Sequence, residues 1–108
     1  YFDYSYRAVP LENVYNYDPV PAELNEAEAK YILGAQGNVW TEFMTSESQV
    51  EYMALPRMLA VSEVVWTQVE NKNLDDFMQR LTISSTRLTL AEYCYCPLEL
   101  ISEKNLTA

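Results

Sequence analysis

Two side chains in the middle of the chain have the right chemistry to hold a sugar. Trp40 and Glu42 follow an apolar run of small residues, so a flat apolar surface and a carboxylate should lie close together. A sugar ring has apolar C–H faces and polar hydroxyl edges, which an indole and a hydrogen-bonding acid can match. The plainer alternative is that Trp40 packs in the core and Glu42 caps the next helix.

A second candidate pair opens the sequence. In an extended segment side chains alternate, so Tyr1 and Asp3 share one face and Phe2 takes the other. A phenol donor and a carboxylate on one face can bind a carbonyl and a hydroxyl, although an ordinary strand end with solvated polar groups is also compatible. The adjacent acids Asp75 and Asp76 are better explained by the favourable charge of a helix start than by catalysis.

The elements that must position these residues begin with a long loop. Residues 1–22 predict an extended start and then a packed, tyrosine-rich loop interrupted by three prolines, which break any long helix. Asn25 and Glu28 have the spacing of a capping box, so a short helix should start there. The apolar residues 32–40 then predict a buried strand whose glycines approach other backbone closely.

Two longer helices follow. The first begins near Ser46, ends around Thr67, and should kink or restart at Pro56. The second begins after Asn73, and its threonines weaken the helix in its later turns. From Cys94 onward the chain predicts a tail that runs over the surface. The expected inward-facing stripes are Ala54, Met58, Val61 and Val65 in the first of these helices and Leu74, Phe77, Met78 and Leu81 in the second.

The predicted order is strand, loop, helix, strand, helix, helix. Strands that alternate with helices indicate an α/β fold with a parallel sheet, but two strands cannot form a sheet with both faces covered. The pattern therefore predicts a fragment whose other strands lie outside the chain or in a partner, and Tyr1 rather than Met stands first. Such a fragment should aggregate, oligomerise or be only partly ordered when it is expressed alone.

Composition excludes several classes of function. The 108 residues contain no histidine, which removes histidine triads and histidine zinc sites, and two glycines are too few for a phosphate-binding loop. A net charge of −9 disfavours nucleic acid and anionic membrane surfaces, and no apolar run is long enough to span a bilayer. Cys94 and Cys96 predict free thiols, because a disulfide across one residue is strained. No metal and no organic cofactor is implied.

Several strings of residues resemble family 20 glycoside hydrolases, the β-N-acetylhexosaminidases. The longest and most specific is Gly-Ala-Gln-Gly-Asn-Val-Trp-Thr-Glu at 34–42, and Tyr-Phe-Asp at 1–3 stands in the right order before it. The other similar strings are residues 14–21, 51–57, 60–66, 71–77 and 80–81. The resemblance thus covers residues 1 to about 81 and becomes loose in the tail.

The resemblance implies a C-terminal fragment of a (β/α)8 TIM barrel, comprising about the last two βα units and the closing helices. Residues 1–22 would be the end of the seventh strand and its loop, residues 23–45 a helix and the last strand, and residues 46–108 the closing helices and tail. It also implies a retaining reaction in which the acetamido oxygen of the substrate is the nucleophile.

The resemblance assigns roles to the candidate residues. Tyr1 would donate its hydroxyl to the acetamido oxygen, Trp40 would form a wall of the sugar pocket, and Asp3 and Glu42 would accept hydrogen bonds from sugar hydroxyls. The substrate would be a glycan that carries a terminal N-acetylhexosamine, and a periplasmic or secreted location is favoured.

The Asp-Glu pair that supplies the acid in this family is absent from the sequence. The isolated chain is therefore expected to be inactive and to require the rest of the barrel upstream. The alternative interpretation is a non-catalytic carbohydrate-binding module.

Overall fold

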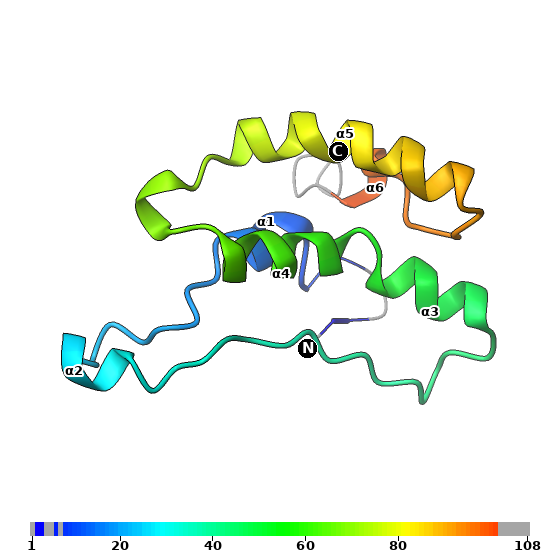
Figure 1. Ribbon diagram of the computed structural model, residues 1–108. Helices are drawn as coiled ribbons and strands as arrows, with labels where there is room; N and C mark the ends of the chain where they lie inside the picture. Colours follow the sequence, from blue (N-terminus) through cyan, green and yellow to red (C-terminus); the bar gives the residue numbers. More distant parts are fainter. Residues whose placement is uncertain (1, 4–5, 7, 102–108) are drawn as a thin grey trace.

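The computed structural model describes residues 2–3, 6 and 8–101 of the chain, and they form a helical assembly (Figure 1). Its elements are α1 (Leu11–Tyr15), α2 (Glu26–Ala29), α3 (Glu47–Ala54), α4 (Arg57–Trp66), the 3-10 helix η1 (Val69–Asn71), α5 (Leu74–Leu90) and α6 (Leu98–Ile101). Within the described residues the β-structure is a single parallel bridge between Phe2 and Val39. None of the described helices is long and apolar enough to cross a membrane.

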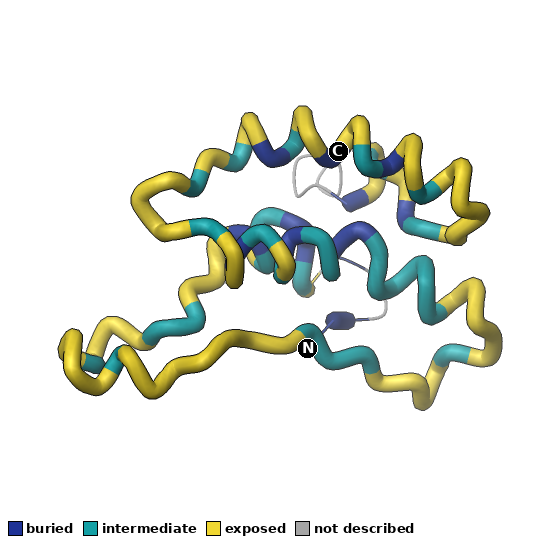
Figure 2. The backbone as a smooth tube through the Cα atoms, viewed as in Figure 1, coloured by how far each residue is buried: buried dark blue, intermediate teal, exposed yellow. Residues whose placement is uncertain are grey.

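The core lies where α1, α4, α5 and α6 come together. Figure 1 shows α5 running above α4, with α1 beside α4 and the extended segment between α2 and α3 along the opposite side. Buried residues gather between these helices, whereas the extended segment is largely exposed (Figure 2). The core side chains are Tyr6, Leu11, Tyr15, Ala60, Phe77, Leu81, Cys96 and Ile101. The rings of Tyr15 and Phe77 stack at 5.0 Å between centroids and join α1 to α5.

Three polar side chains start the helices where the sequence places them. Asn25 and Glu28 form the complete capping box of α2. Ser46 caps α3 by accepting a hydrogen bond from the Gln49 N–H, and Asn73 caps α5 by accepting one from the Asp76 N–H. Each cap satisfies a backbone donor that has no partner inside its helix.

Pro56 divides the predicted long helix into α3 and α4. Proline has no N–H to donate to the preceding turn, and Leu55 adopts extended backbone angles between the two helices. α4 then ends at Trp66, with Thr67 as its C-terminal cap. The predicted restart and the predicted end are both confirmed.

Five other predictions about local structure are corrected. The loop over 1–22 contains α1, which begins after Pro10 and buries Leu11 and Tyr15. The buried face of α4 is Arg57, Ala60 and Val64, while Val65 is exposed, because α4 joins the core with Leu11 and Tyr15 through Ala60.

α5 stays helical to Leu90, past the threonines that were expected to weaken it. Thr82, Thr86 and Thr89 turn their hydroxyls back onto helix carbonyls four residues earlier in the chain, such as Met78 O and Ser85 O. The segment after Cys94 also differs from the prediction of a surface tail. Cys96 is buried, and α6 brings Ile101 into the core.

The prediction of a buried strand over 32–40 is wrong for the described structure. Residues 31–36 are exposed, and Leu33 keeps 96% of its surface open to solvent. A strand needs a partner along its length, and the described part of the chain offers this segment only Phe2. The segment is extended and unpaired apart from that one bridge.

Candidate functional site

The parallel bridge between Phe2 and Val39 brings the two candidate motifs together. The Phe2 N–H donates to the Asn38 carbonyl at 2.9 Å. Asp3 directly follows Phe2, and Trp40 directly follows Val39, so the two motifs lie on neighbouring segments although 36 residues separate Asp3 from Val39. Tyr1, the other candidate at this end, lies outside the described residues.

Gly37 lets the two segments approach each other. A Cβ at this position would lie 2.7 Å from Cζ of Phe2 and 3.0 Å from Cε of Met58, so any side chain there would collide with the Phe2 ring. At Gly34 a Cβ would meet nothing within 4 Å. Gly37 therefore makes room for side chains rather than for the close approach of another backbone that the sequence predicted, and Gly34 has no close neighbour.

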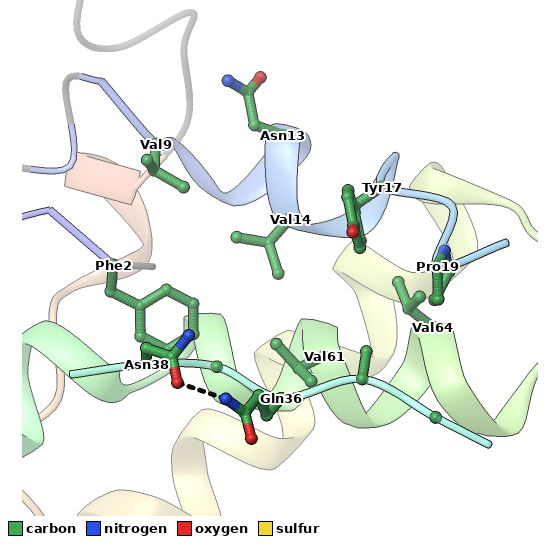
Figure 3. A pocket seen from close by; sticks show the side chains of 13 residues that line it. Phe2, Val9, Asn13, Val14, Tyr17, Pro19, Gln36, Asn38, Val61 and Val64 are labelled. Carbon is green, nitrogen blue, oxygen red and sulfur yellow. Dashed lines mark hydrogen bonds between the residues drawn. The ribbon is translucent and has the colours of Figure 1, made fainter. Parts of the chain in front are cut away.

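A hollow of about 450 Å³ lies beside this contact, on the side of α1 and α4 (Figure 3). Figure 3 shows Phe2, Val14 and Val61 facing it, with the backbone of residues 34–38 along one wall. Gln36 donates to the Asn38 side chain at 2.8 Å in this wall. The lining contains none of the predicted site residues, so the hollow and the candidate sugar contacts are separate features.

Trp40 and Glu42 lie at the exposed end of the extended segment. Trp40 keeps 56% of its surface accessible, and Glu42 is exposed in a turn closed by the Met44 N–H donating to the Thr41 carbonyl at 3.1 Å. Ser46, not Glu42, caps α3. Within the described residues the indole is therefore not packed in the core, and the carboxylate caps no helix.

Asp3 has a different environment, because its carboxylate is buried and already engaged. Its Oδ1 accepts hydrogen bonds from the Tyr6 N–H at 3.1 Å and from Nη1 of Arg57 at 2.5 Å, and its Oδ2 accepts one from the Ala8 N–H at 3.0 Å. The alternative of a solvated polar strand end is therefore wrong at Asp3. Its assignment to a sugar hydroxyl stays a prediction.

Arg57 is the buried cation that holds this carboxylate, and its side chain has no exposed surface. Besides the Asp3 carboxylate, the guanidinium binds three backbone carbonyls. Nε and Nη2 donate to Met53 O at 3.0 and 2.7 Å. Nη1 donates to Val9 O at 3.1 Å, and Nη2 donates to Asp3 O at 2.9 Å. Five contacts match the five N–H donors of a guanidinium.

The sequence analysis missed the role of Arg57, although a signal was present. Arg57 is the only charged residue between Glu51 and Glu63, in an otherwise apolar stretch. A lone charge in such a stretch is either exposed or paired with a buried partner, because an unpaired buried charge is very costly. Its partner lies 54 residues away, a distance that the sequence alone does not bridge.

Tyr6 ties the same region to the junction between α3 and α4. Its hydroxyl lies 2.6 Å from Tyr52 O and 2.8 Å from Leu55 O. Pro56 has no N–H to offer to Tyr52 O, so the hydroxyl contacts a carbonyl that the helix break leaves without its usual partner. Burial raises the pKa of the Tyr6 hydroxyl, with the Arg57 charge opposing, so Tyr6 stays a neutral donor.

The two adjacent acids and the two cysteines, which the sequence analysis also considered, lie outside the candidate sugar contacts. Asp75 and Asp76 lie in the first turn of α5, as expected for a helix start, and Asp76 binds Arg80 at 2.8 Å. Both cysteines are free, with Cys94 exposed and Cys96 buried. In the part of the chain that the structure describes, no three His, Cys, Asp or Glu side chains form a group that could hold a metal ion.

These motifs point to a carbohydrate-active barrel enzyme, and comparison with known proteins agrees with this class. The model of the glycosyl hydrolase family 20 catalytic domain matches residues 2–69. A β-hexosaminidase of Porphyromonas gingivalis is 43% identical over 81 residues, which are 75% of this chain and 10% of that protein. A β-N-acetylhexosaminidase of Cellulomonas fimi is 33% identical over 76 residues, covering 68% of this chain and 14% of that protein.

A shorter match reaches the N,N'-diacetylchitobiase of Vibrio harveyi, which is 35% identical over 48 residues, 44% of this chain and 5% of that protein. The chain therefore belongs to glycosyl hydrolase family 20, and the resemblance drawn from its motifs is confirmed. The catalytic domain of this family is a TIM barrel. The chain spans about a tenth of the length of the Porphyromonas relative, so it corresponds to a small part of such an enzyme.

Proposed function

We propose that this chain forms part of the sugar site of a β-N-acetylhexosaminidase, which releases a terminal N-acetylglucosamine or N-acetylgalactosamine from a glycan. The observation that supports the proposal is the pairing of Phe2 with Val39, because Asp3 directly follows Phe2 and Trp40 directly follows Val39. The matched relatives are hexosaminidases and a chitobiase, which supports the same reaction class.

In this proposal the exposed indole of Trp40 forms a wall against the apolar face of the sugar and its acetamido group. Glu42 accepts a hydrogen bond from a sugar hydroxyl at the far edge of the ring. Asp3 accepts another while Arg57 and two backbone N–H groups hold its carboxylate in place. Tyr1 donates its hydroxyl to the acetamido oxygen and steadies it for attack.

The proposed reaction is retaining and assisted by the substrate. The acetamido oxygen attacks the anomeric carbon, the bond from that carbon to the leaving oxygen breaks, and a carboxylic acid protonates the leaving oxygen. Water then opens the cyclic intermediate at the same carbon and returns a proton to the acid. No Asp-Glu pair occurs in this sequence, so we assign the acid, and the carboxylate that orients the acetamido group, to residues outside this chain.

The chain requires the rest of the barrel for activity. Residues 1–22 would contribute the end of the seventh strand and its loop, residues 23–45 a helix and the eighth strand, and residues 46–108 the closing helices and tail. The long exposed face of residues 31–36 supports this placement, because in a barrel those residues would be covered by neighbouring strands.

The test uses the full-length protein, meaning the product of the complete reading frame that contains residues 1–108. It should hydrolyse 4-nitrophenyl N-acetyl-β-D-glucosaminide and leave the matching β-D-glucoside, which has no acetamido group, uncleaved. Replacing the acetyl group by mono- and trifluoroacetyl should slow the reaction stepwise, because fluorine withdraws electrons from the attacking oxygen. Equal rates across that series would contradict the substrate-assisted step.

The same assays separate the enzyme from a non-catalytic binding module. A module predicts binding of N-acetylglucosamine, measured by Trp fluorescence, without hydrolysis of any aryl glycoside. A reading frame without an Asp-Glu pair upstream of Tyr1, together with sugar binding and no turnover, would replace the proposed enzyme by that module.

A further inference from the structure

Arg57 joins three segments that are far apart in the sequence. Its guanidinium binds Asp3 at the start of the chain, the Val9 carbonyl just before α1, and the Met53 carbonyl at the end of α3. No buried side-chain nitrogen or oxygen among the described residues lacks a hydrogen-bond partner, so this buried cation is fully satisfied.

Aromatic rings complete the enclosure of the guanidinium. Its Cζ lies 3.8 Å from the ring centroid of Tyr6 and 4.6 Å from that of Phe2. Phe2 is also the residue that pairs with Val39, so one side chain contacts both the guanidinium and, at Gly37, the segment that leads to Trp40. The cation therefore touches both residues that follow Tyr1.

Tyr6 adopts an unfavourable backbone conformation in this arrangement. Its φ is 62°, a left-handed conformation that is unusual for a bulky side chain. The Tyr6 N–H bond to Asp3 and the contacts of its hydroxyl with Tyr52 O and Leu55 O hold it there. Such strain persists only where the surroundings over-determine it, and it concentrates at functional sites.

Stability alone does not explain a buried ion pair. Replacing such a pair by well-packed apolar residues is often neutral or stabilising, because both charges must be taken out of water. What a guanidinium adds is geometry, since its planar fork fixes the direction of each bond it makes. The fork here fixes both the side chain and the carbonyl of Asp3.

We propose that Arg57 is a positioning residue of the sugar site: it fixes the backbone at Phe2 and Asp3 against Val39, and thereby the place of Tyr1 and Asp3 relative to Trp40. This inference rests on the proposed function and deepens it. Arg57 does not touch the substrate. It acts through the residues that do, so its loss should impair the orientation of the acetamido group more than the binding of the sugar.

The test compares Arg57→Lys with Arg80→Gln in the full-length protein. Lysine keeps the charge but loses the fork, so kcat toward the aryl N-acetyl-β-glucosaminide should fall on the order of 10- to 100-fold, as for a misplacement of about 1 Å, with a much smaller change in KM. Arg80 is a half-exposed arginine paired with Glu63 and Asp76, and Arg80→Gln should keep the wild-type kcat.

A double-mutant cycle separates positioning from a general structural role. If Arg57 acts through Tyr1, Arg57→Lys should cost less in a Tyr1→Phe background than in the wild type, because the contact it positions is already gone. An equal fold-loss in both backgrounds, or a wild-type kcat in folded Arg57→Lys, would overturn the proposal. The activities of the wild type and of Arg80→Gln test the proposed function separately, because neither measurement depends on the role of Arg57.

A second variant keeps the proposal testable if Arg57→Lys does not fold. Tyr6→Phe removes the hydroxyl that reaches the helix junction, and with it the anchor of the ring that lies 3.8 Å from the Arg57 guanidinium. It should lower kcat about fivefold, the value of one typical hydrogen bond, and show the same non-additivity with Tyr1→Phe. An unchanged kcat in Tyr6→Phe, or an additive cycle with Tyr1→Phe, would overturn the proposal by this route.

Discussion

The ring of Phe2 lies against Gly37 so closely that a Cβ there would be 2.7 Å from its Cζ. The same phenylalanine donates its N–H to Asn38 and contacts the Arg57 guanidinium. One residue therefore links the start of the chain, the segment that leads to Trp40, and the buried cation.

Gly37→Ala should disturb the site through this contact. The new methyl group must displace the Phe2 ring, which costs about 1–3 kcal/mol of stability as in other overpacked sites. In the full-length protein we expect a lower melting temperature and a reduced kcat. Gly34→Ala is the matched control, because a Cβ there meets nothing within 4 Å, and it should behave like the wild type. Equal melting temperatures for the two variants would contradict the packing argument.

The helix boundaries could be predicted because they depend on local chemistry. Asn25, Ser46 and Asn73 each satisfy a backbone donor within three residues, and Pro56 ends α3 through its own missing N–H. Such signals need no knowledge of the rest of the fold.

The buried strand over 32–40 could not be settled in this way. An apolar run says that a segment is suited to burial, but the surface that buries it must come from other strands. The described chain supplies only Phe2, so the segment stays exposed. The same difference separates the residues of the candidate site. Trp40 and Glu42 could be found by their motif, whereas the role of Arg57 depends on its pairing with Asp3, which is 54 residues away.

The two acids of the candidate site should respond differently to neutralisation. Glu42→Gln changes an exposed side chain, so the melting temperature should stay the same as in the wild type. The kcat/KM should fall on the order of 10- to 100-fold, which corresponds to the loss of one hydrogen bond to a charged group. Asp3→Asn weakens the buried pair with Arg57, so it should lower both the melting temperature and kcat/KM. The exposed Glu23, changed to Gln, is the control for Glu42. Wild-type kinetics in Glu42→Gln would remove Glu42 from the site.

The N-terminal caps of α5 and α2 should contribute differently to the stability of the protein, although both are asparagines. Asn73→Ala removes the acceptor for the Asp76 N–H in a helix that buries Phe77 and Leu81, and about 1 kcal/mol of stability should be lost. Asn25→Ala removes the equivalent bond in α2, which buries no residue, so global unfolding should barely change. Chemical denaturation of both variants measures the difference. An equal loss at both positions would mean that α2 is covered in the full-length protein.

Alkaline pH should destabilise the junction where α3, α4 and the tail meet. Hydrogen bonding with the Cys96 thiol, helped by burial, raises the pKa of Tyr52 from 10.0 to about 12, and burial raises the pKa of the Cys96 thiol from 9.0. The folded state therefore holds these protons more tightly than the unfolded chain. Their contribution to stability is complete below about pH 9 and is lost as the pH rises toward 12.

The measurement is the melting temperature of the full-length protein between pH 7 and pH 12, followed alongside the absorbance of tyrosinate. Tyr52→Phe removes one of the two groups, so the decline above pH 10 should become shallower. Tyr31, which keeps 74% of its surface exposed, provides the control, and Tyr31→Phe should follow the wild-type curve. If Tyr52→Phe and Tyr31→Phe gave the same curve, the link between Tyr52 and alkaline stability would be wrong, and the loss above pH 9 would have to come from Cys96 or from other groups.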